Sequence, residues 1–197
     1  MAPRVEYASG LDTDDPRCVV SIIGCTGDWT GGWDNTPPGG VDRFITEDLQ
    51  KGRMVEVIQR GQPAIMVCHW TGIYWNGQEL GFRIFQEVVR RLHARFDHLI
   101  WMKLSDLSRY SAARELTRVT RNGEALIFRA PFTCPDFTLS FASRGNTPPR
   151  LRVRESVSLL KEVSGPLKLE SNTWCRAGET VTVCLNMPKG NSRLETI

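Results

Sequence analysis

Short apolar segments alternate with amphipathic ones over the first 117 residues of the chain. Three runs are apolar almost throughout, which is typical of strands buried on both faces: residues 18–23, 64–68 and 99–102. Between the last two runs, apolar residues recur every three or four positions from Phe82 to Phe96 and predict an amphipathic helix. Weaker helical patterns cover residues 44–58 and 105–117. Because strands and helices alternate, the pattern predicts parallel strands with helices packed outside them.

The pattern changes after residue 117, where only strands and turns are predicted. The dipeptide Asn122-Gly123 is typical of a type I′ β-hairpin. Further extended runs are separated by turn-forming residues: 125–129, 137–142, 151–153, 156–160 and 180–185. We therefore expect three parts, namely an N-terminal extension (1–17), a partial α/β barrel (18–117) and a small all-β, sandwich-like domain (118–197).

Composition and charge narrow the classes of partner. Hydrophobic residues make up 41% of the 197 residues and charged residues 24%, the balance of an ordinary globular protein. The formal net charge of +3 comes from basic residues scattered among nearly as many acids, so no nucleic-acid partner is expected. No apolar run approaches the ~20 residues that span a bilayer, and the N-terminus lacks the apolar core of a signal peptide. As it stands, the chain is expected to have no membrane partner and to be cytoplasmic.

The six cysteines show no Cys-x-x-Cys spacing. Three of them lie in or beside apolar runs, where a reduced thiol packs as a small apolar group. We expect buried thiols, with a Cys175–Cys184 bridge as the alternative in an exported protein.

His69 follows directly after the second apolar run. Ligands of α/β folds collect at the C-terminal ends of strands, so this position favours a functional side chain over a structural histidine. Trp70, Tyr74 and Trp75 follow within six residues, and clustered aromatic rings beside a polar strand end suit stacking against sugar faces. The sequence therefore predicts a carbohydrate site beside His69.

A long glycine-rich loop, residues 24–40, follows the first apolar run and carries Asp28, Trp29 and Trp33. Parallel strands would place this loop on the same rim as His69. A carboxylate there would orient the imidazole and stabilise its protonated form, which can act as a general acid. The alternative is that the aspartates of the loop are turn formers and its tryptophans a packed flap.

Three segments carry a family resemblance: residues 66–70 (Met-Val-Cys-His-Trp), the helix from Phe82 to Phe96, and residues 99–107. Together they resemble the closing part of the polysaccharide deacetylase fold, in which a late strand ends in an apolar-apolar-x-His motif. The resemblance implies that His69 is the general acid toward the leaving group. Residues 27–29 (Gly-Asp-Trp) resemble part of a motif that follows the preceding strand in the family, which implies that Asp28 is the partner of the histidine.

The metal ligands of that family have no counterpart here. The family binds a divalent metal such as zinc through an early Asp-Asp pair and a His-x-x-x-His pair. Asp14-Asp15 lacks the preceding apolar strand, and His93 and His98 are one residue too far apart. The chain is therefore expected to hold no cofactor or metal itself, and the resemblance implies zinc only if an N-terminal half supplies the ligands.

We therefore expect an α/β fold, the C-terminal part of a deacetylase-like (β/α) barrel followed by a small all-β domain. The expected function is that of a carbohydrate-active hydrolase-like protein, incomplete or inactive alone because the metal-ligand motifs are absent. The alternative is a non-catalytic carbohydrate-binding or interaction module, with His69 as a hydrogen-bond donor. In both cases the residues expected to line the sugar are Trp29, Trp33, Trp70, Tyr74 and Trp75.

Overall fold

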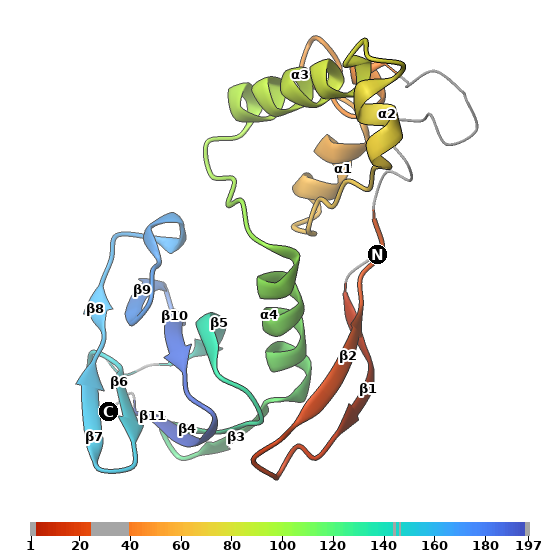
Figure 1. Ribbon diagram of the computed structural model, residues 1–197. Helices are drawn as coiled ribbons and strands as arrows, with labels where there is room; N and C mark the ends of the chain where they lie inside the picture. The colour runs from red at the N-terminus through yellow and green to blue at the C-terminus, as the bar shows by residue number, and fades with distance from the viewer. Residues whose placement is uncertain (1–2, 25–39, 144, 146, 196–197) are drawn as a thin grey trace. The chain divides into compact units, whose positions relative to one another are not determined.

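The computed structural model of the chain describes residues 3–24, 40–143, 145 and 147–195. Its contacts divide the chain into two compact units, one helical and one made mostly of strands (Figure 1). The helical unit comprises residues 1–3 and 22–101, and the β unit comprises residues 4–21 and 102–197.

The prediction of a (β/α) barrel is wrong. Residues 64–68 and 99–102, expected to be buried strands, form no strand. The first apolar run does contain a strand, β2 (Arg17–Ser21), but this strand pairs antiparallel with β1 (Arg4–Ser9) in a local hairpin. Within the described residues the strands lie in three sheets, none of which closes into a barrel, and the α-helices number four. The hydrolase and deacetylase assignments that accompanied the barrel lose their structural support with it.

The error has a physical reason, because an apolar run does not specify its partner strand. The β1 strand lies just upstream of β2. Because the connection between them is short, pairing the two strands costs little loop-closure entropy. Gly10 begins the turn with a φ of 61°, and its carbonyl oxygen accepts a hydrogen bond from the Thr13 backbone N–H at 3.0 Å. The hairpin satisfies the backbone of the apolar run without burying both faces, and Val19 stays 57% exposed.

The helical unit packs one long helix against shorter elements that precede it. It contains a 3₁₀ turn, η1 (Val41–Arg43), and the helices α1 (Arg53–Gln59), α2 (Trp70–Tyr74) and α3 (Leu80–Arg95). The helix predicted between Phe82 and Phe96 is confirmed as α3. The core of the unit is made of Phe44, Ile45, Met54, Val55, Ile84, Val88, Leu92 and Phe96.

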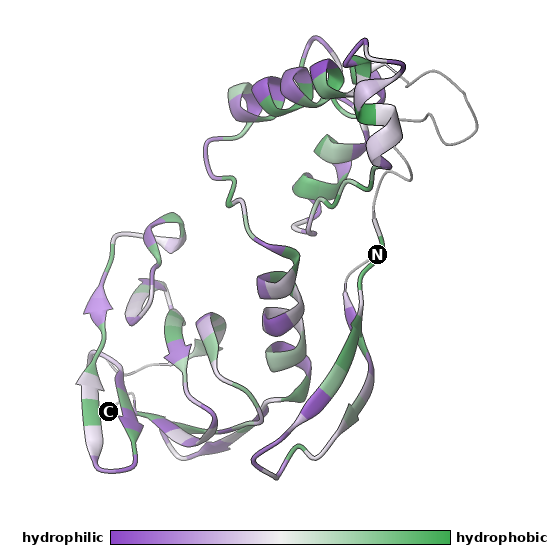
Figure 2. Cartoon of the chain, in the orientation of Figure 1, coloured by the Kyte–Doolittle hydropathy of each residue, from purple (hydrophilic) through white to green (hydrophobic). Residues whose placement is uncertain are grey.

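The buried face of α3 differs from the predicted one. The core takes up Ile84, Val88 and Leu92, which are spaced four residues apart. Phe82 and Phe85, which the periodicity placed on the buried face, are 42% and 36% exposed. The helix therefore carries two apolar stripes, of which the core buries one, and hydrophobic and hydrophilic residues alternate around it in Figure 2.

A partly buried arginine fixes the rotation of α3 about its axis. The guanidinium of Arg91, with a side chain only 12% exposed, donates to Asp42 Oδ1 at 2.6 Å and to the carbonyl oxygen of Ile45 at 2.9 Å. It also donates to Glu87 Oε1 at 2.8 Å, one turn earlier on the helix. Charged donors that are withdrawn from water need such acceptors, so these bonds hold α3 against the segment that contains η1.

The β unit joins two sheets and one helix around a common core. The five-stranded sheet has the order β3-β4-β11-β6-β7, and the four-stranded sheet has the order β5-β10-β9-β8 within the described residues. The strands are β3 (Arg118–Asn122), β4 (Ala125–Ala130), β5 (Cys134–Ala142), β6 (Arg150–Val153), β7 (Ser156–Leu159), β8 (Lys161–Glu162), β9 (Thr173–Ala177), β10 (Thr180–Met187) and β11 (Gly190–Glu195). Strands were predicted within β4, β5, β6, β7 and β10, and these are confirmed.

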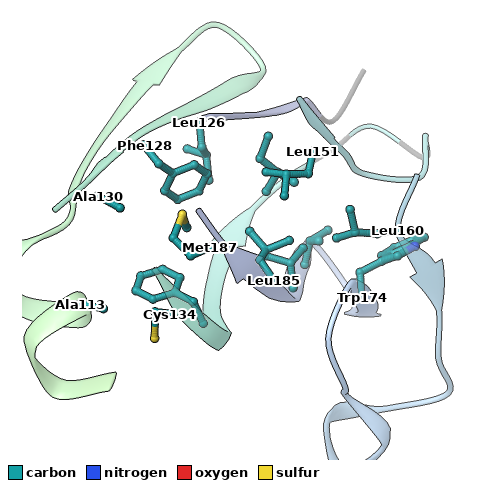
Figure 3. Close-up of a cluster of buried hydrophobic side chains, with 14 residues drawn as sticks. Ala113, Leu126, Phe128, Ala130, Cys134, Leu151, Leu160, Trp174, Leu185 and Met187 are labelled. Atoms are coloured by element: carbon teal, nitrogen blue, oxygen red, sulfur yellow. The ribbon is translucent and has the colours of Figure 1, made fainter. Parts of the chain in front are cut away.

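The inward-facing residues of both sheets meet in one cluster (Figure 3). Phe128 from β4 lies at 0% exposure in this cluster, and Ala113 of α4 (Leu104–Leu116) closes one side. The remaining members are Leu126, Ala130, Cys134, Phe137, Leu151, Leu160, Trp174, Val181, Val183, Leu185, Met187 and Leu194. The β1–β2 hairpin lies against α4, where Glu115 Oε2 accepts from the Val5 backbone N–H at 2.9 Å.

The predicted hairpin after residue 117 is confirmed, with a different turn. Asn122 pairs with Ala125, so it is the last residue of β3, and Gly123 and Glu124 form the two-residue loop. Of these turn residues only Gly123 has a positive φ, at 59°. A type I′ turn would need a positive φ at both central positions, so glycine alone carries the special geometry here.

The cysteines of the β unit core are thiols, and no bridge joins Cys175 to Cys184. In the β9–β10 pairing, Cys175 lies opposite Thr182 and Cys184 lies opposite Thr173, so the two thiols are not cross-strand partners. Burial raises the pKa of Cys134 to about 11, which leaves it protonated and inert at neutral pH.

We expect the substitution Phe128→Ala to destabilise the β unit by about 3–5 kcal/mol, because it opens a cavity in a fully buried site. Urea denaturation followed by circular dichroism measures the change. The control Leu159→Ala removes an apolar side chain that is 65% exposed on β7, and it should shift the free energy of unfolding by less than about 0.5 kcal/mol. Equal effects of the two substitutions would contradict the assigned core.

Acid should loosen α3 through Glu87. Hydrogen bonds from Arg90 and Arg91 lower the pKa of this carboxyl from 4.5 to about 2. A carboxyl whose pKa is lower in the folded state stabilises the fold above its unfolded pKa, and this contribution is lost as the pH falls from about 4.5 toward about 2. The protection of the α3 amides against hydrogen exchange, taken relative to the intrinsic exchange rate and compared with Glu87→Gln at each pH, should therefore fall in this window in the unchanged protein only. A Glu47→Gln control should keep the acid-dependent fall in protection, and its loss there would argue against Glu87 as the cause.

Candidate functional site

Two aromatic side chains stand out on the helical unit because they are large, apolar and exposed. Trp70 and Tyr74 lie one turn apart on α2, with 71% and 50% of their surface exposed. Their ring centroids are 5.6 Å apart and their planes meet at 85°, an edge-to-face arrangement. In such a pair the edge of one ring meets one face of the other ring, and the remaining exposed faces stay available to a ligand.

The backbone around α2 explains why a five-residue helix can hold this pair. His69 precedes the helix in an extended conformation, and its carbonyl oxygen accepts from the Gly72 backbone N–H at 3.0 Å. At the other end Trp75 takes a left-handed conformation, with a φ of 38°. The chain then turns back, and the Glu79 backbone N–H donates to the carbonyl oxygen of Tyr74 at 2.7 Å. Both ends of α2 are therefore closed by backbone hydrogen bonds.

A close backbone approach fixes α2 on α3. A Cβ atom on Gly81 would lie 2.4 Å from the carbonyl oxygen of Gly72 and 2.9 Å from Cα of Ile73. Side chains do not fit at such distances, so glycine at position 81 is what allows the start of α3 to lie against α2. This contact sets the direction in which the aromatic pair faces.

The other predicted site residues have different outcomes. His69, Trp70, Tyr74 and Trp75 lie on one short segment, and His69 is exposed at its start rather than at the end of a buried strand. Asp28, Trp29 and Trp33 lie outside the described residues. The pairing of Asp28 with His69 therefore stays a prediction, as does the resemblance to polysaccharide deacetylases.

The side chains do not fit the metal of that family. Among the described residues, no three His, Cys, Asp or Glu side chains are grouped so that they could hold a metal ion. Asp15 bonds Arg17 at 2.7 Å in the β1–β2 hairpin. His93 Nε2 accepts a hydrogen bond from Trp101 Nε1 at 3.1 Å, while His98 Nδ1 lies 3.0 Å from Asp97 Oδ1.

Sequence reasoning missed a second exposed feature of the helical unit. An open apolar concavity of about 530 Å³ runs along α3 and is lined by Phe82, Phe85, Gln86, Val89, Arg90, His93 and Trp101. The signal was present, because apolar residues occupy more of α3 than one face can bury. Trp101 was missed because residues 99–102 were interpreted as a buried strand.

No protein-family model, curated protein or solved structure matches the chain when its sequence and fold are compared with them. In the part of the chain that the structure describes, no helix is both long enough and apolar enough to cross a membrane.

We expect Gly81→Ala to disturb the aromatic pair. The added methyl group overpacks the contact with the Gly72 backbone, which lies at 2.4 Å, so we expect a cost near the upper end of about 1–3 kcal/mol, more than the gain in helix propensity of about 1 kcal/mol. Hydrogen exchange of residues 69–80 should accelerate. Gly40→Ala is the matched control, because its φ of −74° is ordinary and a Cβ there meets nothing within 4 Å. Unchanged protection of this segment in Gly81→Ala would contradict the close approach.

Proposed function

We propose that this chain is a non-catalytic carbohydrate-binding module whose binding surface is the aromatic pair of Trp70 and Tyr74. The observation that carries the proposal is the exposure of both rings, which form an edge-to-face pair on α2. Backbone hydrogen bonds satisfy both ends of this short helix. Sugar rings present flat arrays of C–H bonds, and exposed aromatic faces recognise them by stacking.

Polar groups beside the rings suit the hydroxyl groups of a sugar. His69 precedes Trp70, and the turn after α2 exposes Asn76 and Gln78. Imidazole and carboxamide groups donate and accept hydrogen bonds, and few such groups are needed to orient a ligand on an apolar floor.

Preorganisation supports the same proposal. The aromatic pair is held in place before a ligand arrives. Backbone hydrogen bonds at the two ends of α2 and the close contact between Gly72 and Gly81 hold it. A surface that is already ordered loses less conformational entropy on binding, which matters for a ligand that contacts only two rings.

Titration of the protein with chitin and xylan oligomers, followed by tryptophan fluorescence, tests the proposal. We expect saturable binding that falls at least about tenfold in Trp70→Ala, because a stacked indole contributes about 1.5–3 kcal/mol. Trp101→Ala is the matched control and should bind as the unchanged protein does, since it removes another exposed indole of the same unit. His69→Ala should weaken binding by only about two- to tenfold, as expected for one hydrogen bond.

An unchanged spectrum at millimolar oligosaccharide would overturn the proposal, and so would equal binding by the unchanged protein and Trp70→Ala. Equal losses in Trp70→Ala and Trp101→Ala would move the binding surface away from α2.

A further inference from the structure

The concavity along α3 exists because this helix is apolar on two adjacent faces. One stripe, Ile84, Val88 and Leu92, is buried in the core of the helical unit. The second stripe, Phe82, Phe85 and Val89, lies toward the concavity and is at least partly exposed. Exposed neighbouring phenylalanines on a helix mark a surface that gains free energy when another molecule covers it.

Trp101 forms the wall of this concavity. Its indole Nε1 donates to His93 Nε2 at 3.1 Å, and the two rings are 5.8 Å apart at an angle of 31°. The segment that leads to Trp101 is anchored upstream, where Phe96 is buried in the core and Leu99 packs against it. The indole is therefore held beside α3 and is still 57% exposed.

The dimensions fit one face of a helix. The lining residues extend from Phe82 to His93, about 17 Å along α3 at the rise of an α-helix. An occupant with apolar side chains at positions i, i+3 or i+4, and i+7 would place them along this length.

Charge identifies the kind of helix. Within Leu80–Arg95 there are four arginines and one glutamate, a net charge of +3 without His93. Arg83 and Arg90 are seven residues apart and so lie on the same edge of α3. Arg90 lines the concavity and forms two bonds to Glu87, at 2.7 and 2.6 Å, while Arg83 is exposed and has no ion pair among the described residues. Arg83 is therefore the cation of this edge that an acidic occupant would pair with, and Arg90, already bonded to Glu87, adds a weaker attraction.

The same edge disfavours a second copy of the chain. Two α3 helices packed antiparallel about a two-fold axis bring the Arg83–Arg90 edge of each copy to the same side of the interface. Like charges brought together there repel each other.

We propose that the α3 groove, formed by Phe82, Phe85, Val89, His93 and Trp101, binds an acidic amphipathic helix of a partner protein. The apolar ridge of that helix covers the two phenylalanines and packs against the Trp101 indole. Its acidic flank lies along Arg83 and Arg90. This site is separate from the aromatic pair on α2, and neither proposal depends on the other.

Fluorescence polarisation with three labelled peptides of about 18 residues tests the groove. The first carries leucines at the i, i+3, i+4 and i+7 spacing with flanking glutamates, the second has lysines in place of the glutamates, and the third is a scrambled form of the first. We expect the first peptide to bind at least about tenfold more tightly than the other two, with an affinity that falls as salt is added. Equal binding of the first and third peptides would overturn the proposal.

Two substitutions separate the apolar and the charged contributions. Phe82→Ser should weaken binding of the acidic peptide by about tenfold or more, because it removes an anchor from the floor of the groove. Arg83→Glu changes an exposed side chain without touching the core, and it should weaken the acidic peptide about fivefold and strengthen the lysine peptide. Trp70→Ala is the control and should leave peptide binding unchanged. Loss of binding in Phe82→Ser without any effect of Arg83→Glu would contradict the acidic character of the partner.

Two further measurements identify other occupants. Sedimentation velocity that shows a dimer dissociated by Phe82→Ser would assign the groove to a second copy and overturn the proposal. Binding to phosphatidylcholine–phosphatidylserine vesicles, lost in Phe82→Ser while the acidic peptide does not bind, would assign it to a lipid surface. We expect a monomer that does not bind these vesicles.

Discussion

The rotation of α3 about its own axis is the constraint on which the helical unit depends. The helix has two apolar stripes, and the core receives the one formed by Ile84, Val88 and Leu92. In this rotation the Arg91 guanidinium reaches Asp42 and the carbonyl oxygen of Ile45. A rotation that buried Phe82 instead would carry Arg91 to the opposite, solvent-facing side of the helix, so these two hydrogen bonds would be lost.

Both proposed binding surfaces follow from that rotation. It directs Gly81 toward Gly72, so that α2 lies directly on α3 and presents Trp70 and Tyr74 outward. It also leaves Phe82 uncovered. The two surfaces differ in chemistry, because one offers aromatic faces with neutral polar neighbours and the other offers an apolar groove with a cationic edge. A ligand that stacks flat suits the first surface, and a ridge of side chains with acidic flanks suits the second.

The two units differ in how far their structure could be predicted from the sequence. Much of the β unit consists of hairpins, in which a strand pairs with its neighbour in sequence, so local patterns located five of its strands. The central strand β11 was missed because Gly190–Glu195 is mostly polar, and its inward-facing residues, Ser192 and Leu194, form a weak alternation. The barrel prediction failed at residues 64–68, whose apolar character was interpreted as a parallel strand, because among the described residues this segment forms only an isolated bridge at Val67 and no strand.

The candidate site also combines residues that the sequence could indicate with residues that it could not. His69 and Trp70 belong together because they are adjacent in the chain, so the sequence could indicate them as a pair. The wall formed by Trp101 required the course of the chain after α3, which the pattern of residues 99–102 misrepresented. Helix periodicity, turn chemistry and adjacency are short-range properties, and these the sequence by itself determined. The tertiary structure alone decided the partner of β2, the face of α3 that is buried and the surfaces that stay exposed, because these depend on contacts such as Arg91 with Asp42, 49 residues apart.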